Sequence, residues 1–490
     1  MLLEQKHSIN KLVVEVNTNN KNVAFKLKDK LDVFLKDEVF PYVESYFESI
    51  ESKFETTYVQ VPKIEIEVNS TSSRNFDDLK RELQTQIVKE ISKTLFEKPA
   101  DRNNVVSFIS EGEYHLKSFL EFIESGTGSG LHLDEDLFEL KHLKEITSTR
   151  GFTPNFIRSL QKENTQQRII NQFDDEQLIF VLGKVVDEVS YDSNDIVFKR
   201  IQNQFLKPSK FKKNIGRLNA RERQMAWRFI FNVLLVTTRN KPDTIAEFFL
   251  QLRKQASVTK SERTFSTALK TVLSALNIDL KEIGIPEEVT LRKKNNKKGL
   301  DTTEDLHPKI EEQEQDQHDF SENDDLTEGI IVQNAGLILL HPYLSQFFRS
   351  CSLLNEQDQL TDKVLAAHVL HYLATKEENA YENQMVFEKL LCGIPSGQSI
   401  NRHESLSDEL KREAEELLSA VIKNWGALKN ASPDLLRYEF LRRSGKIMLK
   451  NNVLKLIVER KTQDILLDKL PWGISYCKLP WLGQLITTDW

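Results

Sequence analysis

The sequence predicts a mainly α-helical protein with small α+β parts. Apolar residues recur every three or four positions through most of the chain, and only a few short stretches alternate at period two. A length of 490 residues also exceeds what one hydrophobic core usually holds. We expect an N-terminal β-α-β-α unit, a helical middle and a C-terminal helical domain with a β-hairpin. The expected domains are an N-terminal α/β domain (1–100), a helical middle region (101–290), a charged disordered linker (291–329) and a C-terminal α+β domain (330–490).

The N-terminal elements follow from two changes of period. Residues 9–16, INKLVVEV, alternate apolar and polar side chains, which predicts a strand. Over residues 23–54 apolar residues recur every three or four positions, which predicts a long amphipathic helix, interrupted or restarted at Pro41. A second strand is expected at 61–68, VPKIEIEV, and a second helix at 76–95.

The middle region is expected to be almost wholly helical. Four loop-like stretches, FIESGTGSG, GFTP, SYDSND and NKPDT, divide it into short helices. The segment RQMAWRFIFNVLLV is apolar nearly all round and therefore should lie in the middle of the helical layer.

Composition changes abruptly after residue 291. The basic run RKKNNKK is followed by Asp301–Glu328, which holds twelve acidic residues and a single basic one, Lys309. No apolar period survives there, so we expect a disordered or extended linker kept open by self-repulsion.

Order is expected to return after Ile330. The stretch VQNAGLILLHPYLSQFFRSCSLL predicts a short apolar segment followed by a helix. Ser432 is a helix N-cap candidate, with Pro433 at the first helical position. KIMLKNNVLKLIVER predicts a β-hairpin with Asn451-Asn452 in the turn, and ISYCKLPWL is the last strand candidate. Further helices are expected at 362–374, 381–392 and 403–428.

Composition also bounds the function classes. The net charge of −7 gives no expectation of nucleic-acid binding. No apolar run approaches the roughly 20 residues of a membrane span, and the N-terminus lacks an apolar signal core, so we expect a cytoplasmic protein. The three widely spaced cysteines form no CxxC pair, which gives no indication of a zinc knuckle or a disulfide framework.

The motifs of common enzyme sites are missing. The glycines at 126, 128 and 130 are followed by no GK[ST], so a flexible loop is expected there rather than a phosphate loop. GxSxG is absent, and Cys392 lies in the apolar stretch KLLCGIP as a buried small hydrophobe. We therefore expect no enzyme, no catalytic residue and no cofactor.

A histidine group supports one rival interpretation. His368 and His371 share a helix face, with His341 as a third candidate ligand, but partner carboxylates or cysteines at matching spacing are not evident. We expect a packed or half-exposed histidine pair and no metal. A metal-dependent enzyme remains the less favoured alternative.

Leu-Pro-Trp occurs twice near the C-terminus. Pro471 and Pro480 fix the backbone before Trp472 and Trp481, and Trp490 ends the sequence. These rings either seal the C-terminal core or anchor a protein interface, where tryptophan is enriched. Trp490 is the better interface candidate, because a terminal residue is rarely held by its own domain. The candidate core or interaction anchors are Trp425, Pro471, Trp472, Pro480, Trp481 and Trp490.

Several stretches in order resemble the contractile injection system tape measure family. They include HSINKLVVEV, DEVFPYVESYF and VPKIEIEV near the N-terminus. The C-terminal stretches are VQNAGLILLHPYLSQFF, HVLHYLATKEE, KLLCGIP, VIKNWGALKNASPDLLRYEFLRRSGKI and LKLIVERKTQDILLDKLPWGIS. The resemblance implies a structural, non-enzymatic role in a phage-tail-like particle, with tube, baseplate or terminator proteins as partners.

Two functions fit that resemblance. A ruler sets tube length by its own extension, and 490 fully helical residues would span roughly 700 Å at 1.5 Å per residue. The ends of this chain are predicted to be globular instead, which favours an assembly component: a chaperone or an end adaptor. Homo-oligomerisation, and residence inside the finished particle, stay open.

Overall fold

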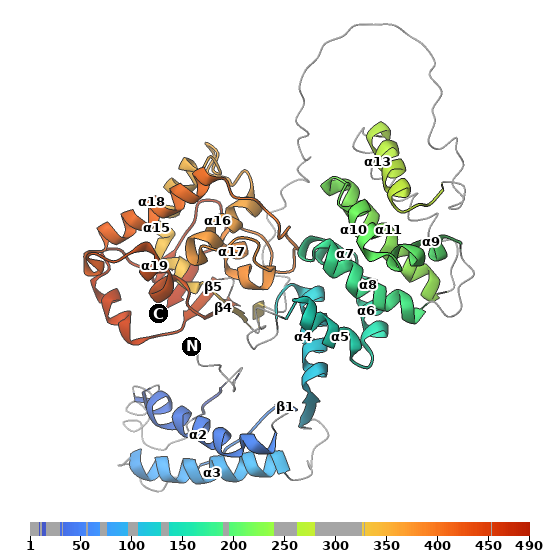
Figure 1. Ribbon diagram of the computed structural model, residues 1–490. Coiled ribbons are helices and arrows are strands. Elements are labelled where there is room, and N and C mark those ends of the chain that lie inside the picture. Colours follow the sequence, from blue (N-terminus) through green and yellow to red (C-terminus); the bar gives the residue numbers. More distant parts are fainter. Residues whose placement is uncertain are drawn as a thin grey trace. The chain divides into compact units, whose positions relative to one another are not determined.

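The structure, a computed structural model, forms two compact units, residues 1–117 and 118–490 (Figure 1). The domain boundaries predicted from the sequence at residues 100, 290 and 329 stay predictions. The structure describes residues 9, 12–15, 30–31, 33–54, 57–68, 76–96, 106–128, 137–189, 196–239, 262–279, 326–327, 329–451 and 453–490.

The N-terminal unit pairs two helices. Phe34, Val39 and Ile50 of the first helical stretch form a buried cluster with Ile87 and Ile91 of the second. Pro41 stands at the start of α2, directly after a π-helical turn, so the interruption predicted there is confirmed. The elements are η1 (Leu35–Val39), α2 (Phe40–Ile50), η2 (Glu51–Lys53), β1 (Thr57–Gln60), α3 (Phe76–Phe96), β2 (Ser107–Ser110) and the first turns of α4 (Glu111–Ser125).

The strands of this unit lie where the sequence analysis did not place them. Ile9 and residues 12–15, the described part of the first predicted strand, form no strand and are exposed. Residues 61–68 form none either, whereas the preceding Thr57–Gln60 pairs with Ser107–Ser110 in an antiparallel ladder. The predicted strand positions are therefore wrong in the described residues, although a β-α-β-α order does occur, in β1, α3, β2 and α4. Alternation marks a segment that suits a strand, but a strand also needs a partner edge, which one segment cannot specify.

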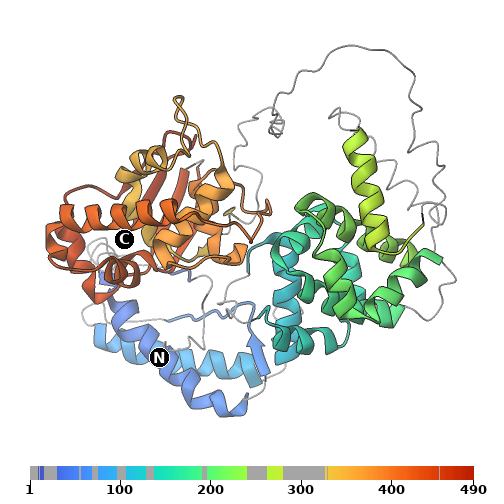
Figure 2. The ribbon, with the colours of Figure 1, turned by 45° about the horizontal axis from the view of Figure 1, so that its top comes forward.

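The described residues between 118 and 279 supply a layer of packed helices, coloured cyan to yellow-green in Figure 2. As predicted, the apolar helix α11 lies in its middle, with Trp227 and Ile230 fully buried. The GFTP break is confirmed, because Gly151 at φ 86° separates two helices; SYDSND and NKPDT lie outside the described residues. The helices after α4 are α5 (Leu140–Ser148), α6 (Phe152–Ser159), α7 (Glu163–Gln172), α8 (Asp175–Val189), α9 (Ile196–Phe205), α10 (Pro208–Ile215), α11 (Ala220–Arg239) and α13 (Glu262–Ala275).

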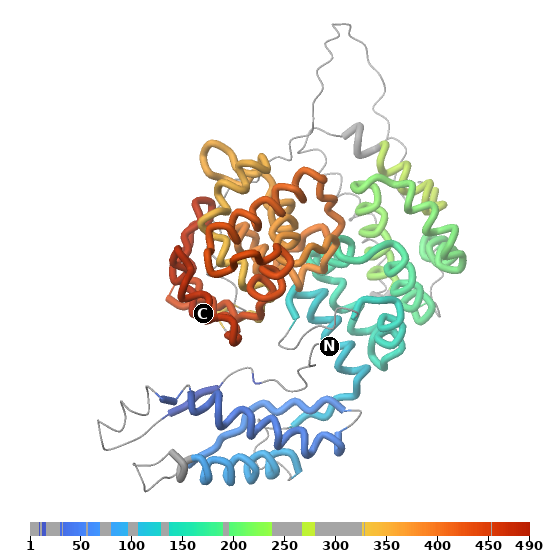
Figure 3. The backbone as a smooth tube through the Cα atoms, turned by 60° about the vertical axis from the view of Figure 1, so that its left-hand side comes forward, coloured from blue at the N-terminus to red at the C-terminus, as the bar shows by residue number. Residues whose placement is uncertain are grey.

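The remaining described part of the second unit, residues 326–490, is the C-terminal domain, a mixed sheet covered by helices. Its backbone is coloured from yellow-orange to red in Figure 3. Asn451, at φ 51°, supports the predicted hairpin turn, and the Ser432 hydroxyl caps the next helix by accepting from the Leu435 amide. The helical elements are η6 (Ala335–Leu340), α15 (His341–Ser350), α16 (Lys363–Thr375), η7 (Glu382–Met385), α17 (Val386–Leu391), α18 (Asp408–Asn424), η8 (Gly426–Leu428), α19 (Pro433–Leu436), η9 (Arg437–Leu441) and η10 (Thr462–Lys469).

The sheet has the order β3-β4-β5-β7-β6. The last predicted strand, ISYCKLPWL, is a strand only at Tyr476–Cys477; the chain instead ends in β7, which runs parallel to β5 and separates it from β6. Parallel pairing between sequence-distant strands cannot be inferred from local alternation. The strands are β3 (Ile330–Val332), β4 (Gly445–Lys450), β5 (Val453–Val458), β6 (Tyr476–Cys477) and β7 (Ile486–Asp489).

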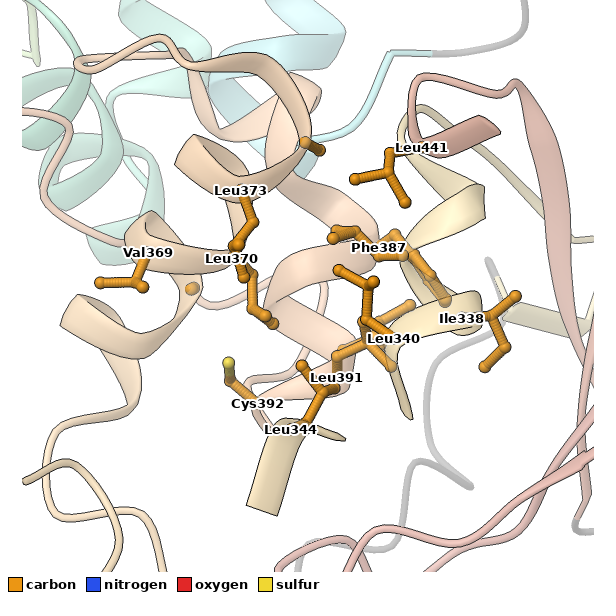
Figure 4. Close-up of a cluster of buried hydrophobic side chains, with 14 of the residues drawn as sticks. Ile338, Leu340, Leu344, Val369, Leu370, Leu373, Phe387, Leu391, Cys392 and Leu441 are labelled. Atoms are coloured by element: carbon orange, nitrogen blue, oxygen red, sulfur yellow. The ribbon is translucent and has the colours of Figure 1, made fainter. Parts of the chain in front are cut away.

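One apolar cluster fills the C-terminal domain. Leu340, Leu370 and Phe387 come from three different helical elements and are fully buried together (Figure 4). Leu326 joins this cluster as well, at the end of the predicted linker, while residues 291–325 lie outside the described residues.

Candidate functional site

Arg168 of α7 is fully buried where the helical layer meets the C-terminal domain. Its Nε donates to the carboxylate of Glu382, which is also fully buried. Its Nη1 donates to the carbonyls of Ile123 at 3.2 Å and Glu124 at 2.7 Å, and its Nη2 donates to the carbonyl of Gly397. One guanidinium therefore contacts residues on both sides of the junction. We call the junction around Arg168 and Glu382 the seam.

Glu382, the first residue of η7, is held from several sides. Its Oε2 accepts from the Ile400 amide at 3.2 Å and lies 3.5 Å from Lys389 Nζ. Its own amide donates to Gln172 Oε1 at 2.9 Å. Lys389 also donates to the Ser396 carbonyl at 2.8 Å, and burial lowers its pKa against the opposing effect of the Glu382 charge. The carboxylate is thus surrounded by donors.

Gly126 makes room for this arrangement. It follows α4 at φ 78°, a left-handed conformation that favours glycine. A Cβ at this position would overlap the Glu382 carboxylate and lie 2.8 Å from Arg168 Nε. The segment predicted as a flexible loop therefore holds a glycine that the seam requires, in conformation and in volume. Gly130 of the same segment lies outside the described residues.

An aromatic cluster continues the seam. The Tyr381 ring packs against Phe138 at a centroid distance of 4.5 Å, and its hydroxyl accepts from Gln177 Nε2 at 2.9 Å. The Arg402 guanidinium covers the same ring, 3.6 Å from its centroid. The Arg402 amide donates to the Asn171 carbonyl at 3.0 Å. Polar and apolar contacts thus join the two parts over several helices.

The chemistry of the seam is positioning rather than catalysis. Its three central charges, on Arg168, Glu382 and Lys389, are all fully buried, so no substrate can reach them. A buried ion pair adds little net stability over a well-packed apolar pair, but it penalises every arrangement that separates its charges. The seam therefore fixes how the helical layer docks on the C-terminal domain.

Lys389→Met is expected to change the free energy of unfolding at pH 7 by about 1 kcal/mol or less, since Arg168 still neutralises Glu382. The pKa of Lys389 lies below its ordinary value of 10.5 in the folded protein, so the unfolded chain binds more protons just below that pH. Wild-type stability should therefore rise relative to the variant as pH increases towards 10.5. Urea unfolding of both proteins from neutral pH to pH 10 measures this, and parallel curves would contradict it.

Trp472 and Trp481 both face their own domain. The Trp472 indole donates to the Leu339 carbonyl at 3.0 Å, and its ring meets Tyr343 edge to face. The Trp481 indole donates to the Leu391 carbonyl at 2.8 Å, and its ring meets Phe348 in the same way. Pro471 and Pro480, which precede them, are exposed.

The other two anchor candidates are also held within the domain. Trp425 is fully buried, donates to the Leu466 carbonyl at 3.2 Å and meets Phe440 edge to face. The half-buried Trp490 donates to Asp464 Oδ2 at 3.0 Å, and its carbonyl accepts from Arg460. The terminal residue is thus tied to its own domain; whether any of the six candidates also contacts a partner stays a prediction.

Trp490→Phe is expected to lower the free energy of unfolding by about 1 kcal/mol, because it removes one hydrogen bond to a carboxylate. Trp490→Ala should cost about 2 kcal/mol, because a half-buried ring is lost as well. Urea unfolding of the full chain checks both values. Unchanged stability in both variants, with failure to enter particles, would instead assign this ring to a partner.

The three histidines bind different partners. His341 Nδ1 lies 3.0 Å from the Ile338 carbonyl, His368 Nε2 lies 2.8 Å from the Asn401 carbonyl, and His371 Nδ1 lies 2.9 Å from Glu388 Oε1. Burial lowers the pKa of His341 and His368. Within the described residues no group of three His, Cys, Asp or Glu side chains could hold a metal ion.

Cys392 is fully buried, as expected, and burial raises its pKa well above the ordinary value.

Sequence reasoning did not find the seam. The available signal was weak: Arg168 directly precedes the apolar pair Ile169 and Ile170, and Glu382 lies in the polar stretch KEENAYENQ, where a charged residue is unremarkable. The two residues are 214 positions apart, so nothing local to either one identifies the other.

Three further findings bear on identity. None of the described helices is long and apolar enough to cross a membrane. No curated protein and no solved structure matches the chain. The family model described as contractile injection system tape measure protein matches residues 6–490. The chain therefore belongs to the contractile injection system tape measure protein family, a family of structural particle components.

Proposed function

We propose that this protein acts as a folded connector during assembly of a contractile, phage-tail-like particle, and that its own extended length does not set the tube length. Its partners would be tube, baseplate or terminator proteins of the same particle. Assembly would take place in the cytoplasm, with the chain at one end of the tube.

The observation that carries this proposal is the seam. A ruler formed by residues 101–329 as one helix would reach about 340 Å at 1.5 Å per residue. The chain instead folds residues 118–279 into a layer, whose longest described helix, α11, has 20 residues and measures about 30 Å. Stretching the layer would separate Arg168 from Glu382, and either charge that stayed buried without its partner would cost several kcal/mol.

A length series tests the proposal without disturbing the described fold. Deleting residues 301–325 would shorten a ruler, and hence the tube, by about 38 Å if helical or about 80 Å if extended. A connector predicts an unchanged tube length, measured by electron microscopy of purified particles. Replacing the same 25 residues with an equally long Gly/Ser-rich sequence controls for composition. If the deletion shortens the tube and the equally long replacement does not, the protein acts as a ruler and the connector proposal is wrong.

Copy number separates the connector from a chaperone. Mass spectrometry of purified, sheath-containing particles should find a few copies of the chain in every particle. Absence from finished particles, with the chain abundant in the cytosol, would identify a transient assembly chaperone instead. Loss of the C-terminal domain should then give abortive or uncapped tubes.

A further inference from the structure

Residues 199–223 form a strongly basic stretch in an acidic protein. They hold nine lysines and arginines and one acidic residue, Glu222, while the whole chain carries a net charge of −7. Eight of the nine cations are exposed, and only Arg223 is partly buried. We call this surface, over α9, α10 and the start of α11, the basic face.

Helix α10 organises the basic face. Lys207 at its N-cap, Lys210 and Lys213 follow one another at a spacing of three, so they share one side of the helix. Phe211 and Ile215 of the same helix are buried. None of the three lysines pairs with an acidic residue in the described part of the chain, whereas the neighbouring Lys212 pairs with Glu176. Three aligned, exposed charges thus remain for an anionic partner.

The chain itself supplies a partner of opposite charge. Asp301–Glu328 holds twelve acidic residues and one basic residue. The end of α13, from which the chain continues towards this acidic segment, lies beside the basic face: Gln204 of α9 donates to the Leu276 carbonyl at 3.0 Å, and Asn214 of α10 donates to the Ala275 carbonyl at 3.4 Å. The chain therefore leaves the described helical layer next to the helices that carry the positive charge, and the acidic segment begins further along the chain, at Asp301.

Both ends of that stretch of chain are fixed to the same unit. Asp279 ends the described helical layer and Leu326 is buried in the C-terminal domain. Twenty-two residues from Asp279 to Asp301 reach at most about 75 Å when extended. A tethered ligand of this kind has an effective concentration in the millimolar range, which favours binding within one chain over binding between chains.

We propose that the basic face of α9–α11 is a docking site for the part of the chain's own acidic segment that precedes the buried Leu326, residues 301–325. Exposed charge pairs of this kind are individually weak and are screened by salt, but several acting together can hold a segment of opposite charge against a surface. Nucleic acid is the less favoured occupant, because no exposed aromatic side chain is interleaved with the cations to stack on bases.

Proteolysis of the full-length protein by a glutamate-specific protease tests the docking. In about 50 mM salt, cleavage within residues 301–325 should be slow in the wild type and about tenfold faster in the triple variant Lys207→Glu, Lys210→Glu, Lys213→Glu. A matched variant with Lys429, Lys450 and Lys478 each changed to Glu, three exposed lysines of the C-terminal domain, should behave like the wild type. In about 0.5 M salt, where the Debye length falls to about 4 Å, all three proteins should be cleaved at the same rate.

Equal cleavage of all three proteins in low salt would overturn the docking site. Zero-length carbodiimide crosslinking of mixed ¹⁴N- and ¹⁵N-labelled wild-type chains then identifies the occupant. Crosslinks from Lys207, Lys210 or Lys213 to the acidic segment within single-isotope chains are expected. Mixed-isotope crosslinks would show that the acidic segment of a second copy, and not the chain's own, occupies the basic face. Crosslinks confined to the lysines of RKKNNKK would show that the acidic segment does not bind the basic face. Oligonucleotide binding that the triple variant loses, without any change in cleavage, would assign the face to nucleic acid.

Discussion

Arg168→Met is expected to lower the free energy of unfolding of the 118–490 unit by about 3–5 kcal/mol. The substitution keeps most of the side-chain volume but removes the charge that neutralises Glu382, whose carboxylate is fully buried. The carbonyls of Ile123, Glu124 and Gly397 lose their donors in the same step. Lys389 Nζ still lies 3.5 Å from the carboxylate, but burial lowers its pKa, so it neutralises Glu382 less fully than the permanently charged guanidinium.

Urea unfolding followed by far-ultraviolet circular dichroism measures this loss. Arg412→Met is the matched control: Arg412 forms ion pairs with Glu409 and Glu416, but its side chain is 61% exposed, so the change should stay within about 0.5 kcal/mol. The triple variant Arg168→Met, Glu382→Leu, Lys389→Met should lose less than Arg168→Met alone, since it removes all three buried charges together. Equal losses in Arg168→Met and Arg412→Met would show that the seam does not join the two parts.

Elements defined by local sequence could be predicted. The helix Phe76–Phe96 follows from apolar residues at helical spacing, and its expected start at residue 76 is correct. The Ser432 cap and the hairpin turn at Asn451 follow from residue types with special backbone preferences. In each case the physical cause lies within a few residues of its effect.

Features that depend on distant partners could not be predicted. Thr57–Gln60 became a strand rather than 61–68 because Ser107–Ser110 offers it an edge, in a region predicted to be helical. The terminal strand β7 lies between β5 and β6, because it pairs in parallel with β5 and antiparallel with β6. The Arg168–Glu382 pair joins positions 214 residues apart. Only a tertiary structure specifies such pairings.

Gly336 is another position whose role depends on a distant element. It lies in η6, in the stretch AGLILL, and is fully enclosed beneath η9. A Cβ at this position would overlap the Phe440 carbonyl oxygen and lie 2.8 Å from Leu441 Cα. These atoms belong to the backbone, so no side-chain rotation relieves the clash, and the two elements pack closely only because residue 336 has no side chain.

Gly336→Ala is therefore expected to lower the free energy of unfolding by about 3 kcal/mol, at the upper end of the usual cost of overpacking, because η6 and η9 must move apart over the apolar core. Gly473→Ala is the control, since a Cβ there meets nothing within 4 Å, and its effect should stay within about 0.5 kcal/mol. Urea unfolding of both variants gives the comparison. Equal stabilities would mean that η6 and η9 are not in direct backbone contact, whereas loss in Gly336→Ala alone supports a C-terminal domain built around that contact. A domain with so little tolerance between its elements suits a rigid connector better than a segment that must extend.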